Sequence, residues 1–176
     1  RSTESIIEEL EFLYKTYGMT GFMFYDDELN VNKKMMVNLM NEVANLQERL
    51  GVDFRLRGFV KAELFNEEQA EAMYRAGFRW LLTGFESGDE TILKAIKKRA
   101  TRDDNTRAVE IAKKYGLKVK ALMSVGHAGE NPESIENTKQ WLLETQPEEF
   151  DCTIITTYPG SPYFDSAIKT GDFYTY

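Results

Sequence analysis

The sequence predicts an α/β protein in which parallel strands alternate with amphipathic helices. Its 176 residues are 42% hydrophobic and 29% charged, which is typical of a globular chain with a substantial core. One module recurs: a helical pattern ends in glycine, and a short apolar or β-branched run follows. Strands joined through helices run parallel with right-handed crossovers. The pattern alone leaves open a doubly wound sheet or a (β/α) barrel.

Apolar spacing and end signals mark the helices. The first helix contains Ile6, Leu10 and Leu13, and the second has apolar residues at helical spacing over 36–50. Glycines suited to a left-handed cap follow four helical patterns, at Gly18, Gly51, Gly77 and Gly116.

Two further helices carry start signals. Asn66 with Gln69 resembles a capping box, and Asn131-Pro132 is a cap followed by proline in the first helical position. The methionines of the second helix are expected in the core; they are Met35, Met36 and Met40.

The strands are expected in the runs after the helices, at residues 21–25, 53–57, 79–83, 118–123 and 152–156. Most of these runs favour β structure or are continuously apolar, as strands buried on both faces should be. Five strands cannot close an eight-stranded barrel, which typically needs about 250 residues.

The composition excludes several classes. The single cysteine, Cys152, rules out an internal disulfide and fits a reducing compartment. No apolar run is long enough to cross a bilayer, so we expect a cytoplasmic protein without a membrane partner. The net charge of −7 disfavours a general nucleic-acid surface, which needs clustered Lys and Arg.

Chemistry in parallel α/β folds occurs at the carboxyl ends of the strands. The runs there are Asp26-Asp27-Glu28, Glu86-Ser87-Gly88, Gly126 to Glu130 and Tyr158-Pro159-Gly160. Glu86 directly follows an apolar strand, where an unpaired carboxylate is costly to bury, so we interpret it as functional.

The other rim residues have plainer interpretations beside the functional ones. Asp26 and Asp27 could cap a solvated loop. Gly126 and Gly129 permit either a tight turn or a close approach to a ligand. We interpret His127 as a loop residue without a catalytic role.

Seven landmarks occur together in one order: 24–29, 76–78, 84–88, 93–98, 115–119, 125–130 and 157–163. In combination they resemble the radical S-adenosylmethionine (SAM) superfamily, in the branch that often carries a cobalamin-binding domain. The resemblance departs at the defining Cys-x3-Cys-x2-Cys loop, which this sequence lacks. Smaller departures are Lys61, where relatives often have Arg, and His127-Ala128 in place of Leu-Pro.

The resemblance implies a partial (β/α) TIM-type barrel, with helices outside a parallel sheet and with the first strand and the cluster loop missing. Residues 1–176 are then one core-barrel domain, incomplete at the N-terminus, of a longer protein.

The resemblance also implies cofactors and chemistry. In such enzymes three thiolates hold a [4Fe–4S] cluster. SAM is reductively cleaved to a 5′-deoxyadenosyl radical for hydrogen abstraction or methyl transfer, and some members use cobalamin. A small-molecule or peptide substrate and an electron donor such as flavodoxin or ferredoxin complete the reaction. The isolated chain should be inactive.

The resemblance assigns roles to particular residues. Asp26 or Asp27 would accept hydrogen bonds from the SAM ammonium, and Glu86 with Ser87 would take the ribose hydroxyls. Lys98 would pair with the SAM carboxylate. The adenine would be lined by two glycines and by the turn after the last strand, namely Gly126, Gly129, Tyr158 and Pro159.

Two alternatives remain open. One is a divalent-metal-dependent barrel isomerase or hydrolase that binds Mg²⁺ or Mn²⁺ through Asp26, Asp27, Glu86, His127 and Glu130. The other is a non-catalytic barrel that serves as a binding scaffold.

Overall fold

The computed structural model describes residues 1–170, except the side chains of residues 166, 167 and 170; residues 171–176 of the expected domain lie outside the described part. In chain order the elements are α1 (Thr3–Tyr17), β1 (Gly21–Met23), α2 (Lys33–Leu50), β2 (Arg55–Phe59), the 3-10 turn η1 (Ala62–Leu64), α3 (Glu67–Arg75), β3 (Phe78–Glu86), α4 (Glu90–Ala95), α5 (Arg102–Lys114), β4 (Lys118–Val125), α6 (Pro132–Thr145), β5 (Glu149–Ile154) and α7 (Pro162–Thr170).

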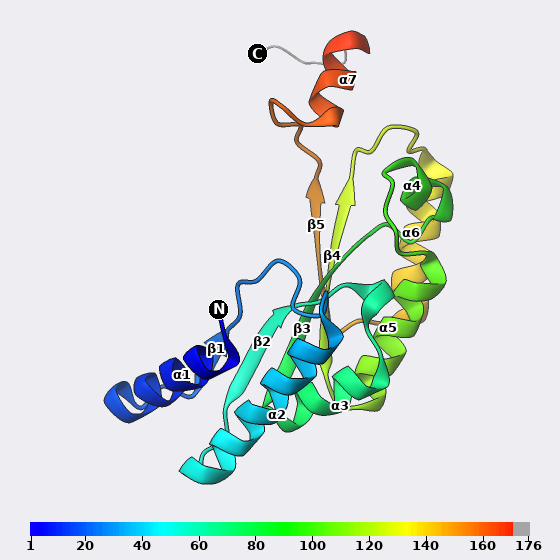
Figure 1. The fold of residues 1–176 in the computed structure, drawn as a ribbon. Coiled ribbons are helices and arrows are strands. Elements are labelled where there is room, and N and C mark those ends of the chain that lie inside the picture. The colour runs from blue at the N-terminus through cyan, green and yellow to red at the C-terminus, as the bar shows by residue number, and fades with distance from the viewer. Residues whose placement is uncertain (171–176) are drawn as a thin grey trace.

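The five strands form one sheet in sequential order, β1-β2-β3-β4-β5, and every neighbouring pair is parallel. Figure 1 shows α2, α3, α5 and α6 following one another along one side of the sheet, while α7 projects beyond the ends of β4 and β5. The sheet is open, with β1 and β5 at its edges. The predicted α/β class with parallel strands and helices outside is confirmed.

The core lies between the sheet and the helices. Alternate residues of the strands point into it, for example Leu56 in β2 and Val119 in β4, which are both 2% exposed. Met36 and Met40 are buried there, but Met35 is 59% exposed, so the prediction is wrong for that residue. Adjacent residues of a helix point about 100° apart, and Met35 therefore turns away when Met36 faces the sheet.

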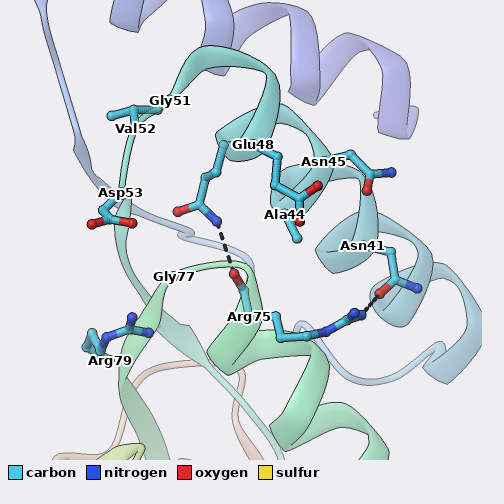
Figure 2. Close-up of a pocket in the computed structure, with 11 residues that line it drawn as sticks. Asn41, Ala44, Asn45, Glu48, Gly51, Val52, Asp53, Arg75, Gly77 and Arg79 are labelled. Carbon is cyan, nitrogen blue, oxygen red and sulfur yellow. Dashed lines mark hydrogen bonds between the residues drawn. The ribbon is translucent and has the colours of Figure 1, made fainter.

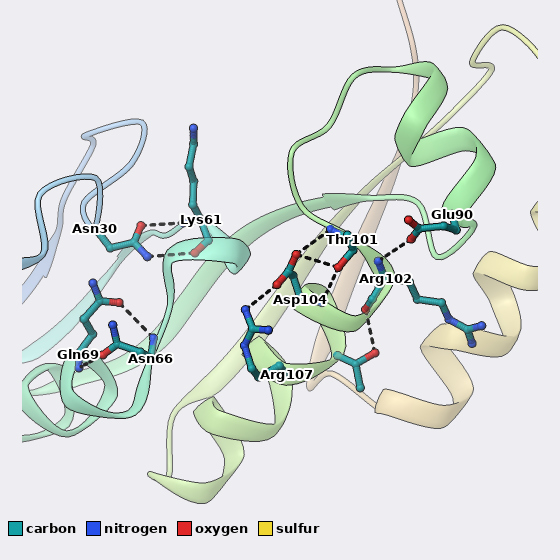
Figure 3. Close-up of polar contacts among 10 residues, drawn as sticks. Asn30, Lys61, Asn66, Gln69, Glu90, Thr101, Arg102, Asp104 and Arg107 are labelled. Carbon is teal, nitrogen blue, oxygen red and sulfur yellow. Dashed lines mark hydrogen bonds and ion pairs between the residues drawn. The ribbon is translucent and has the colours of Figure 1, made fainter.

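The local end signals were predicted well. The side chain of Asn66 accepts from the backbone N–H of Gln69, and the Gln69 side chain accepts from the N–H of Asn66, as Figure 3 shows. Gly18 and Gly51 end α1 and α2 with φ of 67° and 62°, a backbone conformation that residues other than glycine rarely adopt.

Strand limits were predicted less well. β5 begins at Glu149, three residues before the expected start. The prediction missed these residues because Glu149 and Asp151 are charged residues of an exposed edge strand. There they form ion pairs with Lys120 of β4, at 3.6 Å and 2.8 Å. Charged side chains of this kind interrupt the apolar pattern from which a strand is predicted. The sequence also gave no indication of α7.

Candidate functional site

Glu86 ends β3 in an unusual backbone conformation. Its φ is 65°, in the left-handed region that favours glycine, and the register between β3 and β4 shifts at Gly84/Glu86. Holding a non-glycine residue there costs on the order of 1–3 kcal/mol, and such strain concentrates at functional sites. The backbone therefore turns the carboxylate into a position that a regular strand would not reach.

Two side chains hold the Glu86 carboxylate. The Nζ atom of Lys98 lies 3.3 Å from Oε1, and the Ser124 hydroxyl donates to Oε2 at 2.7 Å. Gly84 makes room for this arrangement, because a Cβ atom at that position would lie 2.8 Å from Glu86 Oε1 and 3.5 Å from Lys98 Nζ. Because Gly84 has no side chain, only its backbone lies beside the ion pair.

A hollow of about 630 Å³ opens beside this ion pair, at the carboxyl ends of β2 and β3. Its charged lining residues have both signs and include Asp27, Glu63, Glu86, Lys61 and Lys98. The volume falls within the range of roughly 300–1,000 Å³ that is common for small-molecule sites. Mixed charges suit a ligand that itself carries both signs.

The β1–α2 loop is tied to one wall of the hollow. The buried Asn30 side chain donates to the backbone carbonyl of Lys61 at 3.0 Å and accepts from the Lys61 N–H at 2.8 Å (Figure 3). The Lys61 ammonium in turn forms an ion pair with Glu28 at 2.8 Å. These contacts bring the acidic loop, which is distant in sequence, to the end of β2.

The two aspartates of that loop differ in position. Asp27 lines the hollow and Asp26 does not. Both side chains are exposed, and among residues 1–170 neither has a hydrogen-bond or ion-pair partner. Asp27 is therefore the aspartate placed to meet a ligand in the hollow.

Ser87 faces away from the hollow. It is 1% exposed, and its hydroxyl lies 2.9 Å from that of Thr138 in α6 and accepts from the Asp89 N–H at 3.0 Å. The structure thus gives this hydroxyl a packing role between the end of β3 and α6, and does not bring it to the Glu86 carboxylate.

The glycine loop and the turn after β5 lie further along the same rim. Gly126 and Gly129 have φ of 91° and 89°, and the Glu130 carboxylate accepts from the backbone N–H groups of Gly126 and His127. Tyr158 is 71% exposed, and the Tyr158–Pro159 turn lies on the segment that leads to α7 (Figure 1). None of these residues lines the hollow beside Glu86.

His127, expected to be a loop residue without a catalytic role, is buried in the structure. It is only 6% exposed, and its Nε2 atom lies 2.7 Å from the Ser124 hydroxyl, which itself donates to Glu86. A glycine-rich context suggests a solvated loop, and no local signal places Ser124 or Tyr163 beside the imidazole.

A second hollow, of about 720 Å³, lies at the opposite end of the strands (Figure 2). Asn41 and Glu48 of α2 line it together with Asp53, Arg75 and Arg79, at the start of β2 and β3. Arg75 is bonded to Asn41, and the Arg79 guanidinium stacks on the Tyr74 ring at 4.3 Å. Because catalytic groups of parallel α/β folds gather at the carboxyl ends, the smaller hollow is the candidate site.

The described side chains of the rim fit neither a divalent metal ion nor an iron–sulfur cluster. Within residues 1–170 no three His, Cys, Asp or Glu side chains are grouped to hold an ion. For a [4Fe–4S] cluster the chain has one cysteine, and desolvation with the nearby Glu130 charge raises the pKa of the Cys152 thiol. These residues therefore do not fit a cluster. The hollow instead offers carboxylates, lysines and bare backbone together.

Two known proteins match this chain over almost its whole length. An uncharacterised methyltransferase from Pyrococcus horikoshii is 31% identical over 167 residues, which cover 95% of this chain and 36% of that protein. The anaerobic magnesium-protoporphyrin IX monomethyl ester cyclase of Rubrivivax gelatinosus is 24% identical and covers 100% of this chain and 32% of its own length. The chain thus spans about a third of these relatives.

A solved structure has the same fold. The radical SAM methyltransferase TsrM from Kitasatospora setae, with cobalamin and a [4Fe–4S] cluster bound, superimposes with a TM-score of 0.88 at 20% identity, over 97% of this chain and 32% of its own. Among the helices of residues 1–170, none is long and apolar enough to cross a membrane. The family model described as the radical SAM superfamily matches residues 1–142. The chain belongs to the radical SAM superfamily.

Proposed function

We propose that residues 1–176 form the SAM-binding part of a radical SAM core barrel in a longer protein that performs methyl transfer or hydrogen abstraction. The observation that carries the proposal is the Glu86 carboxylate, held at a strained strand end by Lys98 and Ser124 beside a hollow of suitable size. A side chain fixed in this way is a pre-organised acceptor for ligand hydroxyls.

Each charged group of the hollow has a counterpart on SAM. Glu86 would accept hydrogen bonds from the ribose hydroxyls, and Asp27 would accept from the ammonium group. Lys98 would exchange part of its ion pair with Glu86 for the SAM carboxylate. When bound, SAM supplies the 5′-deoxyadenosyl group whose radical form abstracts hydrogen in this family.

The adenine would lie further along the rim. Gly126 and Gly129 would offer bare backbone, and Tyr158 with Pro159 would offer an apolar surface to a neutral ring. Ser87 would support Glu86 by holding the end of β3 against α6 rather than by touching SAM.

The remaining cofactors and partners belong to the longer protein. A cluster would have to take its thiolates from outside these 176 residues, because the chain has only Cys152. The relatives support a small-molecule substrate and a cobalamin cofactor, and the chemistry requires an electron donor such as flavodoxin or ferredoxin. A cytoplasmic location fits an oxygen-sensitive centre of this kind.

The test is SAM binding to the 176-residue chain, measured by isothermal titration calorimetry. Glu86→Gln keeps the size of the side chain but removes its charge, and we expect SAM affinity to fall roughly ten- to a hundredfold, for about 1.5–3 kcal/mol. Glu8→Gln, the same change at an exposed position of α1, is the control and should leave affinity unchanged.

Equal SAM affinity in the Glu86→Gln variant and the control would refute the assignment. A parallel measurement addresses the cluster: after anaerobic reconstitution, the chain should show no cluster absorption in the visible spectrum. Stoichiometric iron and sulfide retained by the chain would contradict the thiolate argument.

A further inference from the structure

His127, the only histidine of the chain, lies in a chain of side-chain contacts that ends at Glu86. Its Nε2 atom is 2.7 Å from Ser124 Oγ, and its Nδ1 atom is 3.4 Å from the hydroxyl of Tyr163 in α7. Ser124 Oγ is also 2.7 Å from Glu86 Oε2. Ser124 and His127 are 8% and 6% exposed, so water competes little for these contacts.

The direction of each hydrogen bond follows from counting protons. A carboxylate only accepts, so the single hydroxyl proton of Ser124 is donated to Glu86. The contact between Ser124 Oγ and His127 Nε2 then needs its proton from the imidazole, which places the proton on Nε2. In the neutral ring Nδ1 is left as an acceptor, and the Tyr163 hydroxyl donates to it.

The ends of this chain of contacts are held in place. The Glu130 carboxylate accepts from the backbone N–H groups of Gly126 and His127, which fixes the loop that carries the imidazole. Burial, reinforced by the charge of Glu130, raises the pKa of Tyr163, so its hydroxyl keeps the proton that it donates. The rings of His127 and Tyr163 also meet edge to face, with centroids 6.3 Å apart.

The arrangement has a consequence for the carboxylate. Oε2 of Glu86 is engaged by Ser124 on the β4 side, while Oε1 lies toward Lys98 and the hollow. Without the imidazole behind it, the Ser124 hydroxyl is free to rotate and to donate elsewhere. When His127 Nε2–H donates to Ser124 Oγ, the hydroxyl can direct its single proton only toward Glu86.

We propose that Ser124, His127 and Tyr163 form a directional hydrogen-bond relay that orients Glu86 and links it to Tyr163 of α7. The three are positioning residues, since none needs to touch the ligand. The inference rests on the proposed function only for what Glu86 binds. The relay itself exists in the ligand-free chain and can be tested there.

The first test is ¹⁵N NMR of the imidazole in the ligand-free 176-residue chain. We expect the Nε2–H tautomer in the neutral ring and a slowly exchanging Nε2 proton. Ser124→Ala should abolish the slow exchange, and Tyr163→Phe should shift the Nδ1 resonance while the Nε2 proton stays protected. An Nδ1–H tautomer, or a rapidly exchanging Nε2 proton, would overturn the relay whatever the chain binds.

The second test measures SAM affinity by calorimetry, with thermal unfolding of each variant as a check on folding. Ser124→Ala and His127→Leu should weaken SAM binding about three- to tenfold, the effect of one neutral hydrogen bond. His127→Gln keeps a donor toward Ser124 and an acceptor toward Tyr163, and should restore affinity to within about twofold.

The outcomes separate the two proposals. Equal losses in His127→Leu and His127→Gln would mean that His127 acts only through packing, which refutes the relay. Unchanged SAM affinity in Glu86→Gln, together with the expected NMR signature, would refute the proposed SAM contact of Glu86 and leave the relay standing.

Discussion

The two halves of the rim differ in how firmly the protein holds their carboxylate groups in place. In the Glu86 half, which consists of Glu86, Lys98 and Ser124, the carboxylate is bonded on both sides and strained in its backbone. In the loop half, which consists of Asp26 and Asp27, both carboxylates are exposed and unpaired within the described residues. A ligand would therefore meet a pre-organised acceptor in the first half, but would have to order the second.

The difference has a structural origin. Glu86 ends the nine-residue central strand β3, which pairs with β2 and β4 on its two sides. The aspartates follow β1, which has three residues and lies at the edge of the sheet. Trp141 of α6 supports the Glu86 half further, since it is fully buried and meets Phe85 edge to face at 5.1 Å.

The largest expected effect is on stability. Trp141→Ala removes the ring that packs on Phe85 and its Nε1–H bond to Thr106, and should lower the free energy of unfolding by about 3–5 kcal/mol. Tyr25→Ala, beside the loop half, where the side chain is 79% exposed, should change it by less than about 0.5 kcal/mol. Urea denaturation measures both, and similar losses would erase the contrast between the halves.

The next effect concerns the two aspartates. Asp27→Asn should weaken SAM binding roughly tenfold, because a charge-assisted hydrogen bond is lost. The effect is limited because the free-energy cost of ordering the loop offsets part of that bond in the wild-type chain. Asp26→Asn should be silent, since this residue does not line the hollow. Calorimetry that shows the reverse order would mean that the loop turns over when SAM binds.

Backbone strain at Glu86 can be measured separately from its carboxylate. Glu86→Ala and Glu86→Gly both remove the contacts with Lys98 and Ser124, but only glycine accepts a φ of 65° without cost. The glycine variant should therefore be more stable than the alanine variant by about 1 kcal/mol in chemical denaturation. An alanine variant of equal stability would show that the strand end relaxes once the carboxylate is gone.

The smallest expected effect is a pH dependence of the folding stability, which arises at Asp89. Burial of Asp89 opposes its ionisation, but hydrogen bonds from Asn137 and from the N–H groups of Ile92 and Thr91 outweigh burial, and the pKa of Asp89 is lowered. A lowered folded-state pKa contributes stability above the unfolded value, about 3.9, that is lost as pH falls through the folded value.

Asp89→Asn tests this, because asparagine also caps a helix but does not titrate. The wild-type chain should lose more stability than the variant when acid unfolding is followed below about pH 4. Parallel acid-unfolding curves would show that the cap of α4 makes no contribution through its charge.

Sequence reasoning succeeded where the decisive interactions are local. Helical spacing, the Asn66–Gln69 capping box and the glycine ends of α1 and α2 depend on residues a few positions apart. The parallel direction of the strands follows from the helices between them, whereas their sequential order is known only from the structure. The same reasoning singled out Glu86, since a carboxylate after an apolar strand must have a partner or a function.

What the sequence by itself determined is the α/β class, the parallel direction of the strands and the rim on which the polar residues gather. Only the tertiary structure decided which of them meet: Asp27 rather than Asp26 lines the hollow, Ser87 is committed to Thr138, and His127 stands behind Ser124 and Glu86. The physical reason is distance along the chain. These contacts join residues up to 51 positions apart, and their geometry depends on how sheet and helices pack rather than on any pattern that neighbouring residues carry.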